Sequence, residues 1–222
     1  CRELNTENYT TAKYLQDAYD HYINMGVDAF RIDTVKHIAR VTFNNYFLPH
    51  FRQTGGENFF MFGECANIYS SVWDNDIPVQ STPFYTWKES KIYPWSNTPS
   101  EWTINSQSTA DQWDDNKTNT GQPSSTNHYL SGNTYHAPDY SKRSGFGMID
   151  FCMHHNFGNA AAAFDIKKYD DTYNDATWNV VYVDSHDYGP NNTGGLEKRF
   201  DGDQATLAEN MTLMFTFRGI PT

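Results

Sequence analysis

Three short apolar segments that each end on an acid constrain the fold of this chain more than any other feature. They span residues 27–33, 59–64 and 179–187, and they end at Asp33, Glu64 and Asp187. Their length and their β-branched and aromatic residues are typical of strands. Acids gathered at the carboxyl ends of parallel strands are typical of the active face of an α/β barrel. The sequence therefore predicts an α/β protein with an acidic site at one edge of a parallel sheet.

The spacing of these segments predicts alternating helices and strands. Asp33 and Glu64 lie 31 positions apart, and a (β/α)8 barrel averages about 31 residues per unit. The first helix can be capped by Asn8 or Thr10, and Pro49 is expected to interrupt the second helix or to end its first part. Helices are expected at 5–24, 38–54, 156–164 and 203–213. Further strands are expected at 147–153 and 214–217.

Polar residues concentrate around the end of the first segment. Arg31 and Asp33 share one face of the expected strand, because side chains alternate between faces. They are expected to pair, since an isolated buried charge is very costly. Lys36 and His37 follow just beyond the strand end. On this stretch alone, a structural ion pair with a solvated loop explains the pattern as well as a catalytic site does.

The middle of the chain, residues 67–145, is rich in Trp, Tyr, Asn, Ser, Thr and Pro. A structureless loop of this length is unusual in a compact domain, so we expect an excursion with short helices, one of them near 81–91. The most loop-like parts are 93–97 and 111–132. Its aromatic side chains can stack on sugars or simply hold the excursion together.

Composition excludes some classes of function. The net charge of −11, from 27 acids and 16 bases, argues against a nucleic-acid partner, which requires a basic face. Cys1, Cys65 and Cys152 form neither a disulfide framework nor a zinc pattern, and Cys65 is expected to be a small buried residue. No apolar run approaches the ~18 residues of a membrane span. The chain starts at Cys and stops in a strand-like run, so we expect a fragment of a longer protein.

Three motifs resemble signature regions of a known family. They are Phe-Arg-Ile-Asp-Thr-Val-Lys-His at 30–37, Phe-Gly-Glu at 62–64 and Val-Asp-Ser-His-Asp at 183–187. In order and spacing they resemble the second, third and fourth signature regions of the α-amylase family of glycoside hydrolases, although Ala29 stands where many members carry Gly. The resemblance implies that 1–222 is part of a catalytic (β/α)8 barrel, about strands four to eight, with 67–145 as a loop-rich excursion after the fifth strand.

The resemblance also implies a retaining reaction. Asp33 is then the nucleophile, Glu64 the general acid/base and Asp187 the stabiliser of the transition state. Phe60 and Phe62 share a strand face with Glu64 and should give it apolar surroundings. The sequence cannot measure the separation of the carboxyl groups, which distinguishes retention from inversion.

Four further residues are expected to bind substrate: Arg31, Lys36, His37 and His186. By resemblance, His186 contacts the sugar at the cleaved bond, and Lys36 and His37 hold the leaving-group side. That Lys-His pair is typical of members that act on α-1,4-glucans, so the expected substrate is starch or a maltooligosaccharide. The chemistry requires no cofactor. A structural calcium is common in the family, with ligands mostly N-terminal to this chain plus the carbonyl of His37, and the sequence leaves calcium binding open.

Several alternatives stay open at this point. The same residues serve α-glucan transglycosylases such as cyclodextrin glucanotransferases, which pass the glucosyl unit to another sugar. A non-catalytic glucan-binding relative is disfavoured because all three acids are present. Five strands cannot close an eight-strand barrel, so the isolated piece is expected to fold poorly if nothing completes it. An extracellular location follows from the resemblance and not from this chain.

Overall fold

The computed structural model describes residues 3–65, 72–74, 77–79, 85–86, 88, 92–118, 143–157, 173, 176–186 and 204–222. Its α-helices are α1 (Tyr9–Asn24), α2 (Arg40–Thr42), α3 (Leu48–Gly55), α4 (Trp102–Thr118), α5 (Phe151–Asn156) and α8 (Gln204–Thr216), with a π-helical segment η2 (Phe43–Phe47) and 3₁₀ turns η1 (Val35–His37), η4 (Pro99–Glu101) and η7 (Ala176–Trp178). Its strands are β1 (Ala29–Ile32), β2 (Phe60–Gly63), β3 (Val72–Asp74), β4 (Ile77–Val79), β5 (Phe146–Met148), β6 (Val180–Val181) and β7 (Ile220–Pro221).

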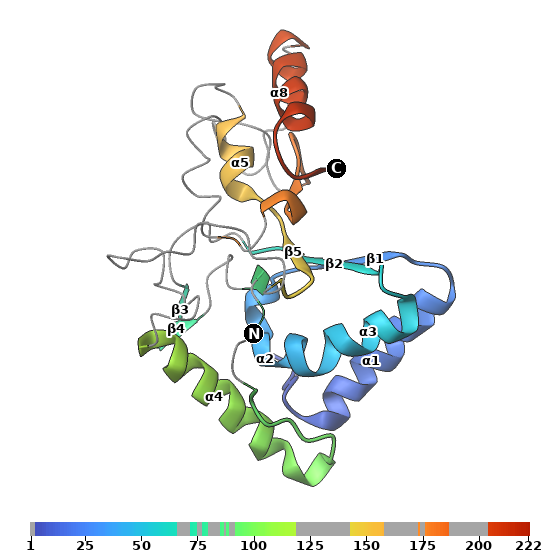
Figure 1. Cartoon of the computed structure of the whole chain (residues 1–222), viewed down its shortest axis with the longest axis vertical. Helices are drawn as coiled ribbons and strands as arrows, with labels where there is room; N and C mark the ends of the chain where they lie inside the picture. The colour runs from blue at the N-terminus through green and yellow to red at the C-terminus, as the bar shows by residue number, and fades with distance from the viewer. Residues whose placement is uncertain are drawn as a thin grey trace.

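A parallel sheet with the order β1-β2-β5 forms the centre of the chain (Figure 1). A parallel bridge between Ile149 and Val180 joins β5 to β6, and β6 pairs in parallel with β7. The predicted α/β class with parallel strands is therefore confirmed. These strands do not close into a barrel within the described ranges, as expected if the barrel is only partly present.

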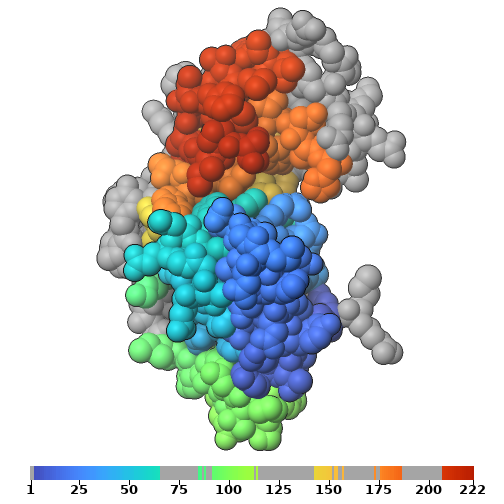
Figure 2. All heavy atoms as spheres, turned by 90° about the vertical axis from the view of Figure 1, so that its right-hand side faces the viewer, coloured from blue at the N-terminus to red at the C-terminus, as the bar shows by residue number. Residues whose placement is uncertain are grey.

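Helices cover one face of this sheet. In β1 the side chain of Ile32 is buried against them, and Phe30 packs between α1 and α3 with its ring 4.9 Å from Tyr19 and 5.9 Å from Phe51. Figure 2 shows the corresponding blue and cyan residues packed closely together, with the green residues of α4 beneath them. The opposite face of β1 carries Arg31, because side chains alternate along a strand.

Helix α1 ends at Asn24 as predicted, and it begins at Tyr9, four residues after the expected start, with the predicted cap at Asn8. The side chain of Asn8 accepts a hydrogen bond from the backbone N–H of Thr10 at 2.9 Å, which satisfies one of the free N–H groups of the first turn. The helix ends at Asn24, and Gly26 follows with φ of 98°, a left-handed conformation that glycine adopts without strain.

The second helical region runs from α2 through η2 to α3, and Pro49 does not interrupt it. Pro49 lies near the start of α3, and Phe47 before it already has helical φ and ψ, so the helical backbone continues through the proline. The irregularity is instead the wider π-helical turn Phe43–Phe47 just before it. A π turn changes the local hydrogen-bond pattern and thereby accommodates the proline ring.

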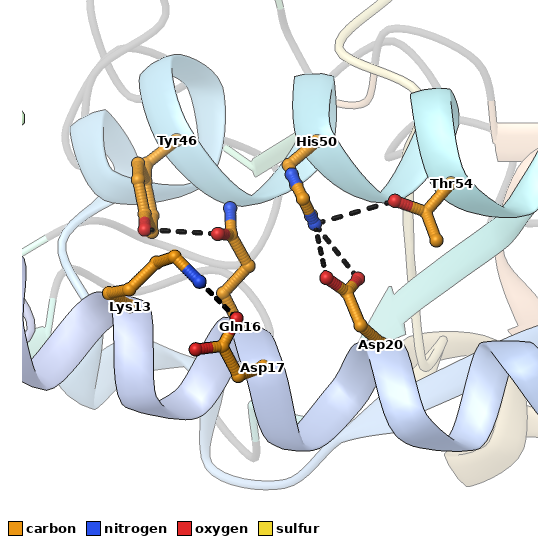
Figure 3. A network of polar contacts seen from close by, with 7 residues as sticks. All are labelled: Lys13, Gln16, Asp17, Asp20, Tyr46, His50 and Thr54. Carbon is orange, nitrogen blue, oxygen red and sulfur yellow. Dashed lines mark hydrogen bonds and ion pairs between the residues drawn. The ribbon is translucent and has the colours of Figure 1, made fainter.

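Polar contacts join α1 to the second helical region (Figure 3). His50 Nε2 lies 2.7 and 2.8 Å from the two carboxylate oxygens of Asp20, and 3.4 Å from the hydroxyl of Thr54. The hydroxyl of Tyr46 donates to Gln16 Oε1 at 3.2 Å, and burial raises the pKa of Tyr46 above its ordinary value. These contacts hold the two helices in register beneath the sheet.

Two of the expected strands are wrong in part. The segment expected at 147–153 is a strand only over β5, because Asp150 accepts a hydrogen bond from the N–H of Met153 at 2.9 Å and begins α5. Residues 214–216 belong to α8, and the last strand is β7. A short apolar run fits either element, and here Leu213 and Met214 pack against α5 and β6. The helix expected at 203–213 is confirmed by α8.

The middle of the chain contains a longer helix than expected. Residues 111–118 form the second half of α4, so the loop expected at 111–132 is wrong there, whereas 93–97 is irregular as predicted. Asn105 anchors this helix by donating to the carbonyls of Glu7 at 2.8 Å and Ser96 at 3.0 Å. Residues 119–132 and 158–164 lie outside the described residues, as does most of the helix expected at 81–91. In the part that is described, none of the helices has the length and apolar character to cross a membrane.

Candidate active site

The structure places Asp33 and Glu64 at the carboxyl ends of two adjacent parallel strands. The N–H of Glu64 donates to the carbonyl of Ile32 at 2.8 Å, and the N–H of Val35 donates to the carbonyl of Glu64 at 2.8 Å. These bonds continue the β1–β2 register, which pairs Ile32 with Gly63. Neighbouring strands lie about 4.8 Å apart, so Asp33 and Glu64 are next to each other on the face opposite the helices.

Thr34 contacts both carboxyl groups. Its backbone N–H donates to Glu64 Oε2 at 3.0 Å, and its hydroxyl donates to Asp33 Oδ2 at 3.2 Å. Its backbone lies in the left-handed region, with φ and ψ of 46°. Sequence reasoning missed Thr34, although its position between the Asp and the following turn was a usable signal.

Arg31 pairs with Asp33, as the alternation of strand faces predicts. The distance from Arg31 Nη1 to Asp33 Oδ1 is 3.1 Å, but the side chains are 33% and 70% exposed. The pairing is therefore confirmed, while the assumption that burial forces it is wrong. Exposed pairs contribute only about 0–1 kcal/mol to stability, so this pair orients Asp33 more than it stabilises the fold.

Apolar side chains lie beside Glu64 on the same sheet face. The rings of Phe60 and Phe62 are stacked, 5.6 Å apart. Phe62 also packs against a buried cluster that includes Phe151 and Tyr182. Glu64 therefore follows a strand whose side chains on this face are aromatic, and the end of the adjacent strand carries a second carboxyl group, that of Asp33.

Lys36 and His37 lie on η1, directly after Thr34. His37 is half-exposed and pairs with Glu3. The buried hydroxyl of Tyr85 supports this turn by contacting the carbonyls of Val35 at 3.3 Å and Ile38 at 3.0 Å, and burial raises the pKa of Tyr85. Tyr85 falls within the helix expected at 81–91, and no sequence signal separated it from the other aromatic residues there.

The third acidic segment is described only in part. β6 leads into Asp184, Ser185 and His186, and the N–H of Ser185 donates to Asp184 Oδ1 at 2.8 Å. His186 is exposed at the same edge of the parallel strands as Asp33. Asp187 lies outside the described residues. The structure thus brings together Arg31, Asp33 and Glu64, and Lys36 and His37 lie on the turn that follows Thr34. It places His186 two strands beyond Glu64.

A fourth acid, which sequence reasoning missed, follows β5. Asp150 is fully buried, and its Oδ2 accepts from Arg218 Nη1 at 2.5 Å and from Asn179 Nδ2 at 3.2 Å. It interrupts an apolar strand-like run after Met148 and Ile149, and an acid at that position was the available signal. Its partners lie next to β6 and β7, so Asp150 links three neighbouring strands.

Within the described ranges, no group of three or more His, Cys, Asp or Glu side chains could hold a metal ion. The structural calcium that the resemblance leaves open stays a prediction.

No family model matches the chain. Part of it is 33% identical over 87 residues to a cyclomaltodextrin glucanotransferase of Klebsiella oxytoca. The aligned segment covers 36% of this chain and 13% of the relative, so the chain spans a small part of the length of that protein. The comparison supports a distant relation to the α-amylase family, whose members include both hydrolases and transferases.

Proposed function

We propose that this chain carries the catalytic carboxyl pair of a retaining α-amylase-type enzyme that cleaves α-1,4-glucosidic bonds in starch or maltooligosaccharides. One observation carries the proposal: Asp33 and Glu64 occupy adjacent strand ends on one sheet face, and Thr34 donates a hydrogen bond to each. Paired carboxyl groups at this edge of a parallel sheet are what glycoside cleavage requires.

In the first step Glu64 donates its proton to the glycosidic oxygen as the carboxylate of Asp33 attacks the anomeric carbon. The bond between that carbon and the leaving oxygen breaks, and an ester between the sugar and Asp33 forms. Arg31 holds one oxygen of the attacking carboxylate through an ion pair, and Thr34 holds the other through a hydrogen bond. Positioning of this kind removes much of the entropic cost of bringing the reacting atoms together.

In the second step Glu64, now a carboxylate, takes a proton from the incoming hydroxyl. The oxygen of that hydroxyl attacks the anomeric carbon, the ester bond breaks, and Asp33 is released as a carboxylate. Water gives a hydrolysis product, whereas a sugar hydroxyl gives a transfer product. Asp187 is proposed to stabilise the transition state from the end of the third acidic segment.

Binding is proposed to involve Lys36 and His37 on the leaving-group side and His186 on the other side of the cleaved bond. The position of Lys36 and His37 on a single turn directly after Thr34 supports this part of the proposal. The preference for α-1,4-glucans rests on the resemblance of this Lys-His pair.

A glucan transferase is the second candidate, and the comparison favours it, because the relative with 33% identity is a cyclomaltodextrin glucanotransferase. Both candidates use the same carboxyl pair. They differ in whether water or a sugar hydroxyl reaches the ester, which depends on the surfaces that bind the acceptor.

The test is an assay of the full-length protein that carries this chain, with soluble starch as substrate and chromatographic separation of the products. Linear maltooligosaccharides support the hydrolase, and cyclic or elongated glucans support the transferase. If starch, pullulan and dextran all stay intact while glucan binding is detected by affinity electrophoresis, the catalytic proposal is wrong.

A further inference from the structure

Thr34 has a backbone conformation that its side chain disfavours. Among the non-glycine residues that the structure describes, it alone has a positive φ, 46°. A β-branched residue in the left-handed region is an outlier, because its Cβ crowds the following carbonyl. Such conformations persist where the surroundings impose them, and they cluster at functional sites.

This conformation turns the backbone N–H of Thr34 toward the neighbouring strand. The N–H donates to Glu64 Oε2 at 3.0 Å, and the next N–H, that of Val35, donates to the Glu64 carbonyl at 2.8 Å. The side chain of Thr34 simultaneously donates to Asp33 Oδ2 at 3.2 Å. One strained residue therefore contacts both the side chain of the proposed acid/base and the proposed nucleophile.

We propose that Thr34 is a positioning residue that fixes the orientation of the Asp33 carboxylate relative to Glu64. The inference rests on the proposed function and adds to it a residue that acts through the two carboxyl groups rather than on the substrate.

The contacts give each carboxyl oxygen a distinct role. A protonated carboxyl group carries its proton on one oxygen and accepts a hydrogen bond on the other. The N–H of Thr34 donates to Oε2 of Glu64. The proton that Glu64 transfers therefore lies on Oε1. Thr34 and Arg31 hold opposite oxygens of Asp33. Each of these oxygens retains a lone pair, so the carboxylate is oriented without being blocked.

The experiment compares Thr34→Val with Thr34→Ser in the full-length protein. Valine keeps the branched shape and removes the hydroxyl, whereas serine keeps the hydroxyl. Thr212→Ala is the matched control, because it removes an exposed threonine hydroxyl that donates to the carbonyl of Ala208 at 2.7 Å in α8. Two substrates are used: soluble starch, and maltosyl fluoride, whose leaving group requires little protonation.

We expect Thr34→Val to lower kcat about tenfold or more on both substrates with little change in KM, as the loss of a hydrogen bond to a charged group predicts. Thr34→Ser should stay within about threefold of wild type, and Thr212→Ala should equal it.

Each other outcome is informative. If the wild type has no activity on either substrate, the proposed function and this inference fail together. If the wild type is active and Thr34→Val equals it, only this inference fails. If Thr34→Val loses activity on starch but not on maltosyl fluoride, the hydroxyl of Thr34 acts on proton donation by Glu64, and the proposal that it orients Asp33 is wrong. Circular dichroism and thermal unfolding check folding, and Thr34→Ala replaces Thr34→Val if the latter does not fold.

Discussion

The fully buried carboxylate of Asp150 lies 2.5 Å from the guanidinium of Arg218. Asp150 follows β5, while Arg218 precedes β7, and Asn179 before β6 donates to the same carboxylate oxygen. A single acid thus links the ends of three parallel strands. A buried charge is tolerated only when its partners compensate for lost hydration.

Replacement of Asp150 by Ala should therefore lower the free energy of unfolding by about 3–5 kcal/mol, because it leaves Arg218 without its buried partner. Denaturant unfolding of the full-length protein measures this loss. Asp17→Ala is the matched control, because Asp17 pairs with Lys13 on the exposed surface of α1, and its loss should cost no more than about 1 kcal/mol. Equal effects of the two changes would show that Asp150 has no special structural role.

A second prediction concerns Gly63, the residue before Glu64. A Cβ at this position would lie 2.7 Å from side-chain atoms of both Val35 and Phe146. Gly63→Ala should cost about 1–3 kcal/mol of stability, and it should also lower turnover because it displaces Glu64. Combination with Val35→Ala removes one of the two close contacts, so the two changes should destabilise less than additively. Strict additivity in the unfolding free energies would contradict the steric explanation.

The third prediction is a loss of stability at alkaline pH. Burial raises the pKa of Tyr85 above its ordinary value of 10.0, because the phenolate is poorly solvated there. The folded state then binds this proton more tightly than the unfolded state does. The resulting stability is complete below about pH 10 and is lost as the pH rises from there toward the folded-state pKa.

Unfolding free energies measured from about pH 9 to about pH 12 should show this decline. Tyr85→Phe should reduce the slope of the unfolding free energy against pH. It should also cost about 1 kcal/mol of stability at neutral pH, because the carbonyls of Val35 and Ile38 lose a hydrogen-bond donor. Tyr14→Phe, at a side chain that is 75% exposed, is the control and should leave the slope as in wild type. If Tyr85→Phe leaves this slope unchanged, groups other than Tyr85 cause the loss of stability at alkaline pH.

The first two strands and the acids after them could be predicted because local pattern and tertiary environment agree there. Residues 29–32 and 60–63 alternate between a helix-covered face and the opposite face, so period-two reasoning finds the strands and places Arg31 beside Asp33. The helix cap at Asn8 could be predicted too, because it depends only on a contact with Thr10, two positions along the chain. Helix α1 could be predicted for the same reason.

Other features depend on contacts that are distant in sequence. Residues 214–216 are helical because α8 packs on α5 and β6, which an apolar run alone does not reveal. The support that Tyr85 gives to η1 spans about 50 positions. Thr34 acts through a left-handed conformation, which nothing in its side-chain chemistry predicts.

The strain at Thr34 gives a fourth prediction. Asparagine tolerates the left-handed region better than a β-branched residue, where the conformation costs roughly 1–2 kcal/mol. Thr34→Asn should therefore raise the free energy of unfolding by about 1 kcal/mol, while it lowers turnover because the hydroxyl that contacts Asp33 is lost. Thermal unfolding and starch turnover are measured on the same samples, with Thr212→Asn as control. Lower stability in Thr34→Asn would show that the strain is not relieved.

The proposed carboxyl roles give the last prediction. Asp33→Ala should abolish turnover of both starch and maltosyl fluoride, because no ester can form without the nucleophile. Glu64→Gln should lower starch turnover about 10²–10⁴-fold, but it should affect formation of the glycosyl ester from maltosyl fluoride much less, because this step requires little protonation. Both variants should still bind glucan.

Asp28→Ala is the control, because Asp28 is exposed just before β1 and lies on the opposite face of the strand from Asp33. Substantial starch turnover by Asp33→Ala would refute the assignment of the nucleophile. If Glu64→Gln slows the ester-forming step equally on starch and on maltosyl fluoride, Glu64 is not the acid that protonates the leaving oxygen.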